Sequence, residues 1–121
     1  MTTTTKILDH YLTCALWSST DDTGEPLDSN YDCSDIAEES SKAAEAEIAD
    51  FLSLCEREGL NPLAEMSAEQ FGHDFWLTRN GHGAGFWDRG LGELGKELTK
   101  WAKTFGSSDA YVGDDGKIYL T

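Results

Sequence analysis

The spacing of apolar residues is the feature that most constrains how this 121-residue chain can fold. In four segments the apolar side chains recur three or four residues apart, which is the period of an amphipathic helix. Glycine, proline and asparagine residues separate these segments and favour turns between them. The predicted helices cover about residues 5–18, 34–59, 67–80 and 91–105.

Residues that favour helix caps stand near the predicted helix starts. Thr5 can cap the first helix, and Asp35 with Glu38 has the spacing of a capping box at the start of the second. Ser67 with Gln70 has the same spacing before the third. In such a box, two side chains satisfy backbone N–H groups that the first helical turn leaves without partners. We therefore expect well-defined helix starts.

The spacing changes to that of a strand near the C-terminus. Residues 111–113 and 117–120 flank Asp-Asp-Gly at 114–116, which favours a hairpin because aspartate and glycine suit a tight turn. An isolated hairpin is marginally stable, so we expect it to pack on a helix or to gain a third strand from residues 85–87. The sequence thus predicts one α+β domain, residues 1–121, with about four helices and a C-terminal antiparallel hairpin or three-stranded sheet.

Acidic residues are concentrated in the first half of the chain. Residues 1–65 carry fifteen Asp and Glu against three Lys and Arg, whereas residues 66–121 carry eight against six. Residues 21–50 hold eleven acids and one lysine, and residues 19–33 are expected to form an exposed acidic loop. A large surplus of negative over positive charge slightly destabilises a compact state, because the like charges repel one another. The surplus therefore indicates a role in solubility, in binding a basic partner or in excluding nucleic acid.

The cysteines and the hydropathy suggest a cellular location. Cys14, Cys33 and Cys55 are odd in number, far apart and without the spacing of a disulfide framework or a zinc site. Free thiols suit a reducing compartment, and no apolar run approaches the roughly 20 residues that a membrane span needs. We therefore expect a cytoplasmic protein that requires no cofactor and does not bind a membrane.

The segment from Phe71 to Gly90, FGHDFWLTRNGHGAGFWDRG, holds the densest set of chemically versatile side chains. His73, His82 and Asp88 are the candidate metal ligands in it, with Asp74 orienting one of the histidines. The same groups could perform acid–base chemistry. The segment contains no nucleotide-binding, zinc-protease or serine-nucleophile motif.

A structural interpretation of this segment is also open. Its glycines could lead the chain from a helix into an edge strand, and Phe86 and Trp87 could supply core. Asp88 with Arg79 or Arg89 could form ordinary ion pairs, which contribute little when they are exposed.

Two parts of the sequence resemble a family of small proteins encoded by tailed bacteriophages and prophages. They are residues 73–89, HDFWLTRNGHGAGFWDR, and residues 113–119, GDDGKIY. The resemblance covers well under half of the chain, implies a phage origin with expression in the host bacterial cytoplasm, and brings no catalytic assignment. Phage genomes encode many short acidic proteins that bind host enzymes, including inhibitors of restriction and CRISPR systems and mimics of DNA. By analogy with these proteins, the resemblance implies that the chain inhibits a host defence system.

These observations favour a non-enzymatic phage accessory protein whose acidic surface binds a basic partner. Carboxylates along a loop and a helix can imitate the phosphate rows of a duplex, and so occupy the basic surface of a host or phage nucleic-acid-binding protein and inhibit or modulate it. The protein itself would not bind nucleic acid. The acids expected to contact the partner are Asp21, Asp22, Glu25, Asp28, Asp32, Asp35, Glu38, Glu39, Glu45, Glu47 and Asp50.

Two other functional interpretations remain open from the sequence. The chain could be a small enzyme or a metal-binding module that uses His73, His82 and Asp88. Alternatively, exposed aromatic side chains could form a homodimer.

Overall fold

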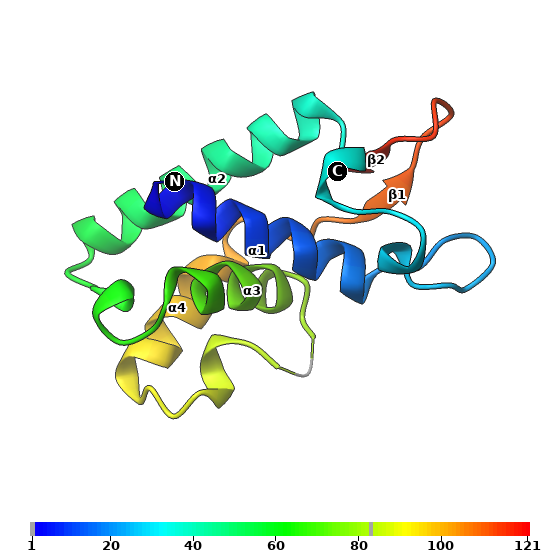
Figure 1. Ribbon diagram of the computed structural model, residues 1–121. Helices are drawn as coiled ribbons and strands as arrows, with labels where there is room; N and C mark the ends of the chain where they lie inside the picture. Colours follow the sequence, from blue (N-terminus) through cyan, green and yellow to red (C-terminus); the bar gives the residue numbers. More distant parts are fainter. Residues whose placement is uncertain (1, 83) are drawn as a thin grey trace.

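A computed structural model describes residues 2–82 and 84–121 (Figure 1). Four α-helices lie in this part of the chain: α1 (Thr3–Ser18), α2 (Glu38–Arg57), α3 (Ala68–Arg79) and α4 (Glu93–Lys103). Short 3-10 helices occur between them: η1 (Leu27–Ser29), η2 (Cys33–Asp35), η3 (Pro62–Ala64) and η4 (Phe86–Asp88). Strands β1 (Ala110–Val112) and β2 (Ile118–Leu120) follow α4. The predicted α+β class, with four helices and a C-terminal antiparallel hairpin, is confirmed.

The core is built around a cluster of phenylalanines. The Phe51 ring of α2 lies 5.3 Å from Phe71 and 4.4 Å from Phe75, both on α3. It also lies 6.0 Å from Phe86 of η4 and 5.6 Å from Phe105, just after α4. These are all five phenylalanines of the chain, and tilted or offset ring pairs at such distances are favourable. The cluster joins α2, α3, η4 and the end of α4 in one core.

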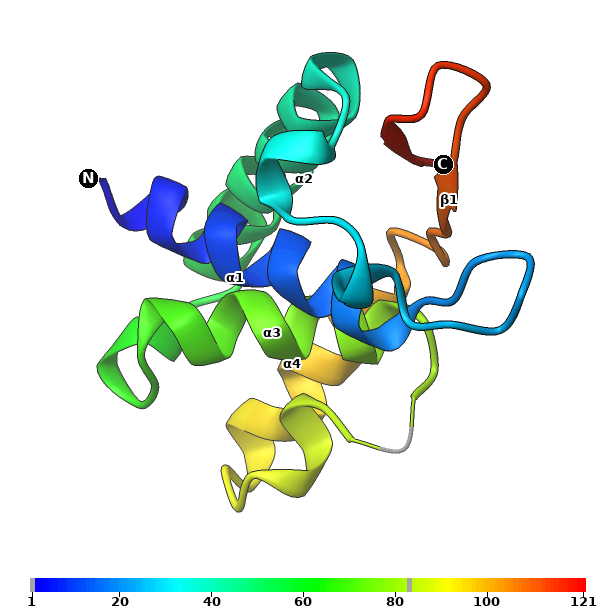
Figure 2. The same cartoon turned by 45° about the vertical axis from the view of Figure 1, so that its right-hand side comes forward.

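Helices α1 and α3 pack side by side in both views (Figures 1 and 2). The close approach is made at Gly72, where a Cβ atom would overlap the carbonyl oxygen of Ile7 and lie 3.1 Å from the Tyr11 nitrogen. Tyr11 of α1 packs its ring 5.5 Å from Phe75 and 5.3 Å from Trp76. Glycine at position 72 therefore sets the distance between the two helices.

The two strands form an antiparallel pair in which Tyr111 lies opposite Tyr119. Of the two expected supports for the hairpin, packing on a helix is confirmed, since the Leu120 nitrogen of β2 donates to Ser40 of α2. The third strand at residues 85–87 is wrong, because Phe86 and Trp87 lie in η4. Phe86 is buried as expected, but Trp87 is 53% exposed and lies outside the core. The additional partner of β2 is Ile36, which forms a single parallel bridge with Ile118.

The starts of the first two long helices differ from the prediction. Thr2, rather than Thr5, caps α1, since its hydroxyl oxygen accepts a hydrogen bond from the Thr5 nitrogen at 3.1 Å. Asp35 does form a capping box, but with Asp32 across η2, so α2 begins only at Glu38. The Asp35 carboxylate, which the spacing predicted to cap α2, caps η2 instead.

The acidic loop at residues 19–33 is mostly exposed, but Leu27, Tyr31 and Cys33 anchor it to the core. Leu27 of η1 is fully buried, and its nitrogen donates to the Ser19 carbonyl at 2.9 Å. A bridge between Thr20 and Pro26 closes the tip of the loop. Among residues 2–82 and 84–121, no helix combines the length and the hydropathy that crossing a bilayer requires.

The close contact at Gly72 predicts a large effect of a single methyl group. We expect Gly72→Ala to lower the free energy of unfolding by about 1–3 kcal/mol, because the new Cβ meets backbone atoms that cannot rotate away. Urea denaturation followed by circular dichroism measures the change. Ala43→Ser, at an exposed position of α2, is the control and should change it by about 0.5 kcal/mol or less. Equal stability of Gly72→Ala and the native protein would contradict the packing.

Candidate functional site

The eleven acids predicted to bind a partner lie on the 19–33 loop, on η2 and along α2. Asp21, Asp35 and Glu47 are partly buried, and the other eight side chains are exposed. The three partly buried acids and some of the exposed ones have contacts within the chain. These contacts separate acids that hold the fold from acids that only face the solvent.

Asp21 organises the acidic loop. One of its carboxylate oxygens accepts hydrogen bonds from the Thr23 nitrogen at 2.8 Å, the Thr23 hydroxyl at 2.6 Å and the Glu25 nitrogen at 3.1 Å. The hydrogen bond from the Thr23 hydroxyl is the main cause that lowers the pKa of Asp21. Glu25 in turn accepts from the Asn30 side chain at 3.1 Å. Both acids therefore serve the loop conformation.

Asp32 and Asp35 are used within η2. Asp32 accepts from the Ser34 nitrogen at 2.9 Å, and its own nitrogen donates to Asp35 at 2.9 Å. The side-chain hydrogen bond from Ser34 is the largest cause that lowers the pKa of Asp32. These two carboxylates satisfy backbone groups at the turn that leads into α2.

Glu47 is bound to Arg79, which the sequence had offered as an ion-pair partner for Asp88 instead. Arg79 is buried at the end of α3, and its Nη2 atom lies 3.1 Å from a Glu47 carboxylate oxygen. The same guanidinium donates to the Tyr11 hydroxyl at 2.8 Å, the Gly106 carbonyl at 2.8 Å and the Phe105 carbonyl at 3.0 Å. Glu47 thus neutralises a buried cation that joins α1, α3 and the end of α4. Glu47 therefore has a structural role, and its place on the partner surface stays a prediction.

The remaining acids have no comparable role in the fold. Glu38 pairs with Lys42 at 3.0 Å, but both side chains are more than 70% exposed, and such pairs contribute little. Five carboxylates make no side-chain hydrogen bond or ion pair within the part of the chain that the structure describes. These solvent-facing acids are Asp22, Asp28, Glu39, Glu45 and Asp50.

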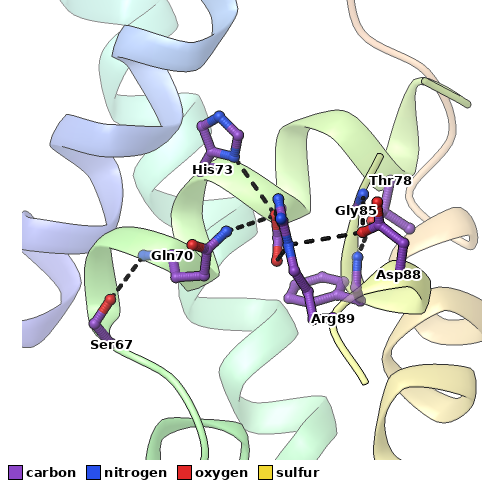
Figure 3. Close-up of polar contacts among 9 residues, drawn as sticks. Ser67, Gln70, His73, Thr78, Gly85, Asp88 and Arg89 are labelled. Atoms are coloured by element: carbon purple, nitrogen blue, oxygen red, sulfur yellow. Dashed lines mark hydrogen bonds and ion pairs between the residues drawn. The ribbon is translucent and has the colours of Figure 1, made fainter. Parts of the chain in front are cut away.

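A second group of polar side chains lies at α3, and Figure 3 labels its members Gln70, His73 and Arg89. Asp74 is fully buried, and Arg89 donates to it from Nε at 3.1 Å and from Nη2 at 2.9 Å. Gln70 donates to the same carboxylate at 2.9 Å, and the His73 ring nitrogen lies 3.5 Å away. The two-point contact with a guanidinium compensates for the loss of water around the buried charge.

The glycine-rich segment is the junction between α3 and η4. The Gly85 nitrogen donates to Asp88 at 3.1 Å, and the Phe86 nitrogen donates to the Thr78 hydroxyl at 3.1 Å (Figure 3). Gly85 has a φ of 156°, and a Cβ atom at this position would overlap the Thr78 hydroxyl oxygen. The structural interpretation of this segment therefore accounts for Asp88, Arg89 and Gly85, while Gly83 lies outside the described residues.

The three candidate metal ligands have different surroundings. His73 packs against Trp17 with 6.0 Å between ring centroids, His82 lines a hollow together with Asn80, and Asp88 accepts from Gly85. In residues 2–82 and 84–121, no group of three or more His, Cys, Asp and Glu is arranged to hold a metal ion. The proposed trio is therefore not brought together, and Asp74 orients Arg89 as well as approaching His73.

The cysteines lie apart from both groups. Burial raises the pKa of Cys14 to about 12 and that of Cys55 to about 11, which disfavours the reactive thiolate. Cys33 is partly buried beside the hydroxyl of Thr13, 3.4 Å away. All three thiols are free, in agreement with the spacing in the sequence.

Comparison of the chain with protein-family models, with curated proteins and with solved structures found no match. The function must therefore be inferred from the residues of this chain and their arrangement.

The buried ion pair between Asp74 and Arg89 predicts a strong effect of a single substitution on stability. Arg89→Ala should lower the free energy of unfolding by about 3 kcal/mol or more, because it leaves a buried carboxylate without its cation. Adding Asp74→Asn should recover part of this loss by removing the buried charge. Chemical denaturation of the single and double variants measures both effects.

The control for this cycle is the exposed pair Lys96–Glu93, whose side chains are 76% and 84% exposed. Lys96→Ala should change the free energy of unfolding by about 1 kcal/mol or less. An Arg89→Ala effect no larger than that of Lys96→Ala would mean that the Asp74 group does not stabilise the fold.

Proposed function

We propose that this protein is a non-enzymatic accessory protein, of phage or prophage origin, that acts in the host bacterial cytoplasm. Its solvent-facing acids bind the basic surface of a host or phage protein that handles nucleic acid, such as a nuclease complex of a restriction or CRISPR defence system. Binding at such a surface would exclude nucleic acid and inhibit or modulate that protein. The observation that carries the proposal is the set of five carboxylates that make no side-chain hydrogen bond or ion pair within residues 2–82 and 84–121, in a region with one lysine.

The arrangement of these acids supports a basic partner. Glu39, Glu45 and Asp50 are distributed along α2, whose twenty residues correspond to a rod of about 30 Å. Asp22 and Asp28 extend the negative surface over the loop that follows α1. Charges repeated over such a length can match a groove built to contact several phosphates.

The charge also fits a partner that is found by electrostatic attraction. A net charge of −14 on 121 residues repels nucleic acid and attracts basic surfaces from a distance of about one Debye length. Complementary charge of this kind raises association rates and discriminates against acidic proteins. Folding alone does not explain this negative charge, because only some of the acidic side chains contact other groups of the chain.

The test is a comparison of two variants with equal charge. The first neutralises the solvent-facing acids: Asp22→Asn, Asp28→Asn, Glu39→Gln, Glu45→Gln and Asp50→Asn. The second neutralises five exposed acids outside this set: Asp9→Asn, Glu56→Gln, Glu58→Gln, Glu65→Gln and Glu93→Gln. Both raise the net charge by five, so a difference between them reports on position rather than on total charge.

Each protein is immobilised and exposed to bacterial lysate, and the proteins retained are identified and eluted by salt or by duplex DNA. We expect the native protein and the second variant to retain a nucleic-acid-binding protein that duplex DNA displaces. The first variant should bind it about tenfold more weakly, and binding should weaken between 50 and 200 mM salt. Equal retention by the two variants, or binding that neither salt nor DNA affects, would refute the proposed function.

A further inference from the structure

The outer face of the hairpin carries aromatic side chains where a solvent-facing strand usually carries polar ones. Tyr111 and Tyr119 lie opposite each other on this face, with ring centroids 5.9 Å apart and planes inclined by 24°. Ala110 and Ile118, which alternate with them along the strands, are buried. Tyr111 is 47% exposed. On the aliphatic face, Ala110 and Ile118 are buried while Val112 is 37% exposed, and the opposite face presents a pair of stacked rings.

Contacts within the hairpin hold Tyr119 in one orientation. Its hydroxyl donates to a carboxylate oxygen of Asp115 at 2.7 Å, and the other oxygen of Asp115 accepts from the Lys117 nitrogen at 3.0 Å. Its ring lies directly against Gly113, where a Cβ atom would overlap the ring. The hydrogen bond to Asp115 is the main cause that raises the pKa of Tyr119 to about 12. A ring fixed in this way loses little conformational freedom when something binds to it.

The hairpin lies beside the start of α2 (Figure 2). The Leu120 nitrogen donates to the Ser40 hydroxyl at 3.0 Å, and the Ala37 nitrogen donates to the Ile118 carbonyl at 2.8 Å. These bonds fix β2 against the first turn of α2, which carries Glu38 and Glu39. Aromatic and acidic side chains from two distant parts of the sequence therefore form one surface.

Two hollows share Tyr119 on this surface. One, of about 620 Å³, is lined by Tyr111, Tyr119 and the carboxylates of Asp114 and Asp115, together with Val112 and Gly113. The other is lined by Tyr119, Glu38, Glu39, Ala37, Lys42 and Lys117. Lys42 is already paired with Glu38. A ring with carboxylates on both sides offers a π-face and anionic oxygens to the same bound cation.

We propose that this tyrosine face binds an arginine side chain from a basic segment of the partner. A planar guanidinium can stack on a tyrosine ring while its N–H groups reach neighbouring carboxylates, whereas a lysine ammonium is a more strongly hydrated point charge that makes no planar contact. The inference rests on the proposed function, since it names the chemistry by which a basic partner is recognised. Tyrosine and arginine are also among the residues that contribute most at protein interfaces.

The experiment compares capped hexa-arginine and hexa-lysine peptides, which have equal charge. Each is titrated into the isotope-labelled protein, and NMR chemical shifts give both the affinity and the residues affected. We expect tighter binding of hexa-arginine by at least twofold, with shifts at residues 111–119 and at Glu38 and Glu39. Tyr111→Leu, which keeps apolar area but removes the π-face, should weaken hexa-arginine binding about two- to fivefold and leave hexa-lysine unchanged.

A control variant separates the π-face of the hairpin from other effects. Trp17→Leu changes an exposed aromatic side chain on α1 and should leave the binding of both peptides unchanged. Equal affinities for the two peptides, absence of binding, or native affinity of Tyr111→Leu for hexa-arginine would overturn the inference. So would light scattering that shows a dimer dissociated by Tyr111→Leu, because the face would then belong to a second copy.

The outcome is distinguishable from failure of the proposed function. Neutralising the five solvent-facing acids tests whether a basic protein binds at all, and Tyr111→Leu leaves those acids unchanged. If the acids are needed for partner binding while arginine and lysine peptides bind equally, the proposed function stands and the arginine inference fails. If the peptides show the arginine preference but charge neutralisation leaves retention from lysate unchanged, the tyrosine face binds arginine and the proposed function fails.

Discussion

Contact of the Phe51 ring with the four other phenylalanines is the interaction on which most of this structure depends. The ring comes from the middle of α2, and its neighbours come from α3, η4 and the residue just after α4. The ring thus joins α2 to three other segments of the chain. Burial of each aromatic side chain contributes on the order of 2 kcal/mol. The cluster holds the inner face of α2 in the core. The outer face of the same helix is therefore free to carry charge.

The acids of the first half divide into two kinds according to what they contact. Asp21, Asp32 and Asp35 bind backbone or hydroxyl groups near them in the sequence, and Glu47 neutralises the buried Arg79. Such carboxylates stabilise the conformation around them. The solvent-facing acids have no such contact, and their mutual repulsion acts against folding. An explanation of the charge surplus in terms of function is needed for the second kind only.

Periodicity was sufficient to predict the helices and the hairpin, because each of these elements buries one face that is visible as a regular pattern. It failed at residues 85–87, where a local interaction decided the conformation: Thr78 and Asp88 bind the backbone nitrogens that a strand would have paired. It also missed the bridge from Ile36 to Ile118, since that contact joins residues eighty-two positions apart. Long-range contacts of this kind leave no trace in local spacing.

The candidate site was predictable in composition but not in its individual members. The sequence placed the acids on the correct loop and helix, yet it could not show that Arg79 would be buried within reach of Glu47. The sequence also did not predict that the tyrosines of the hairpin lie beside the acids of α2, because nothing in either segment indicates this contact. One signal was present in the sequence. Tyr111 and Tyr119 stand at positions on the solvent-facing side of the predicted hairpin, where polar residues are more usual.

The position of each acid along α2 gives a further reason to separate folding from binding. Glu38 and Glu39 lie in the first turn, where the helix dipole favours negative charge by about 0.3–1 kcal/mol each. Glu45 and Asp50 lie beyond that turn, where the dipole gives no such benefit, and no cation among the described residues pairs with them. The start of α2 can therefore be acidic for reasons of stability alone. The acids farther along the helix are better explained by a basic surface outside the chain. The tyrosine face lies at the first turn of α2, where both stability and binding of a cation favour negative charge.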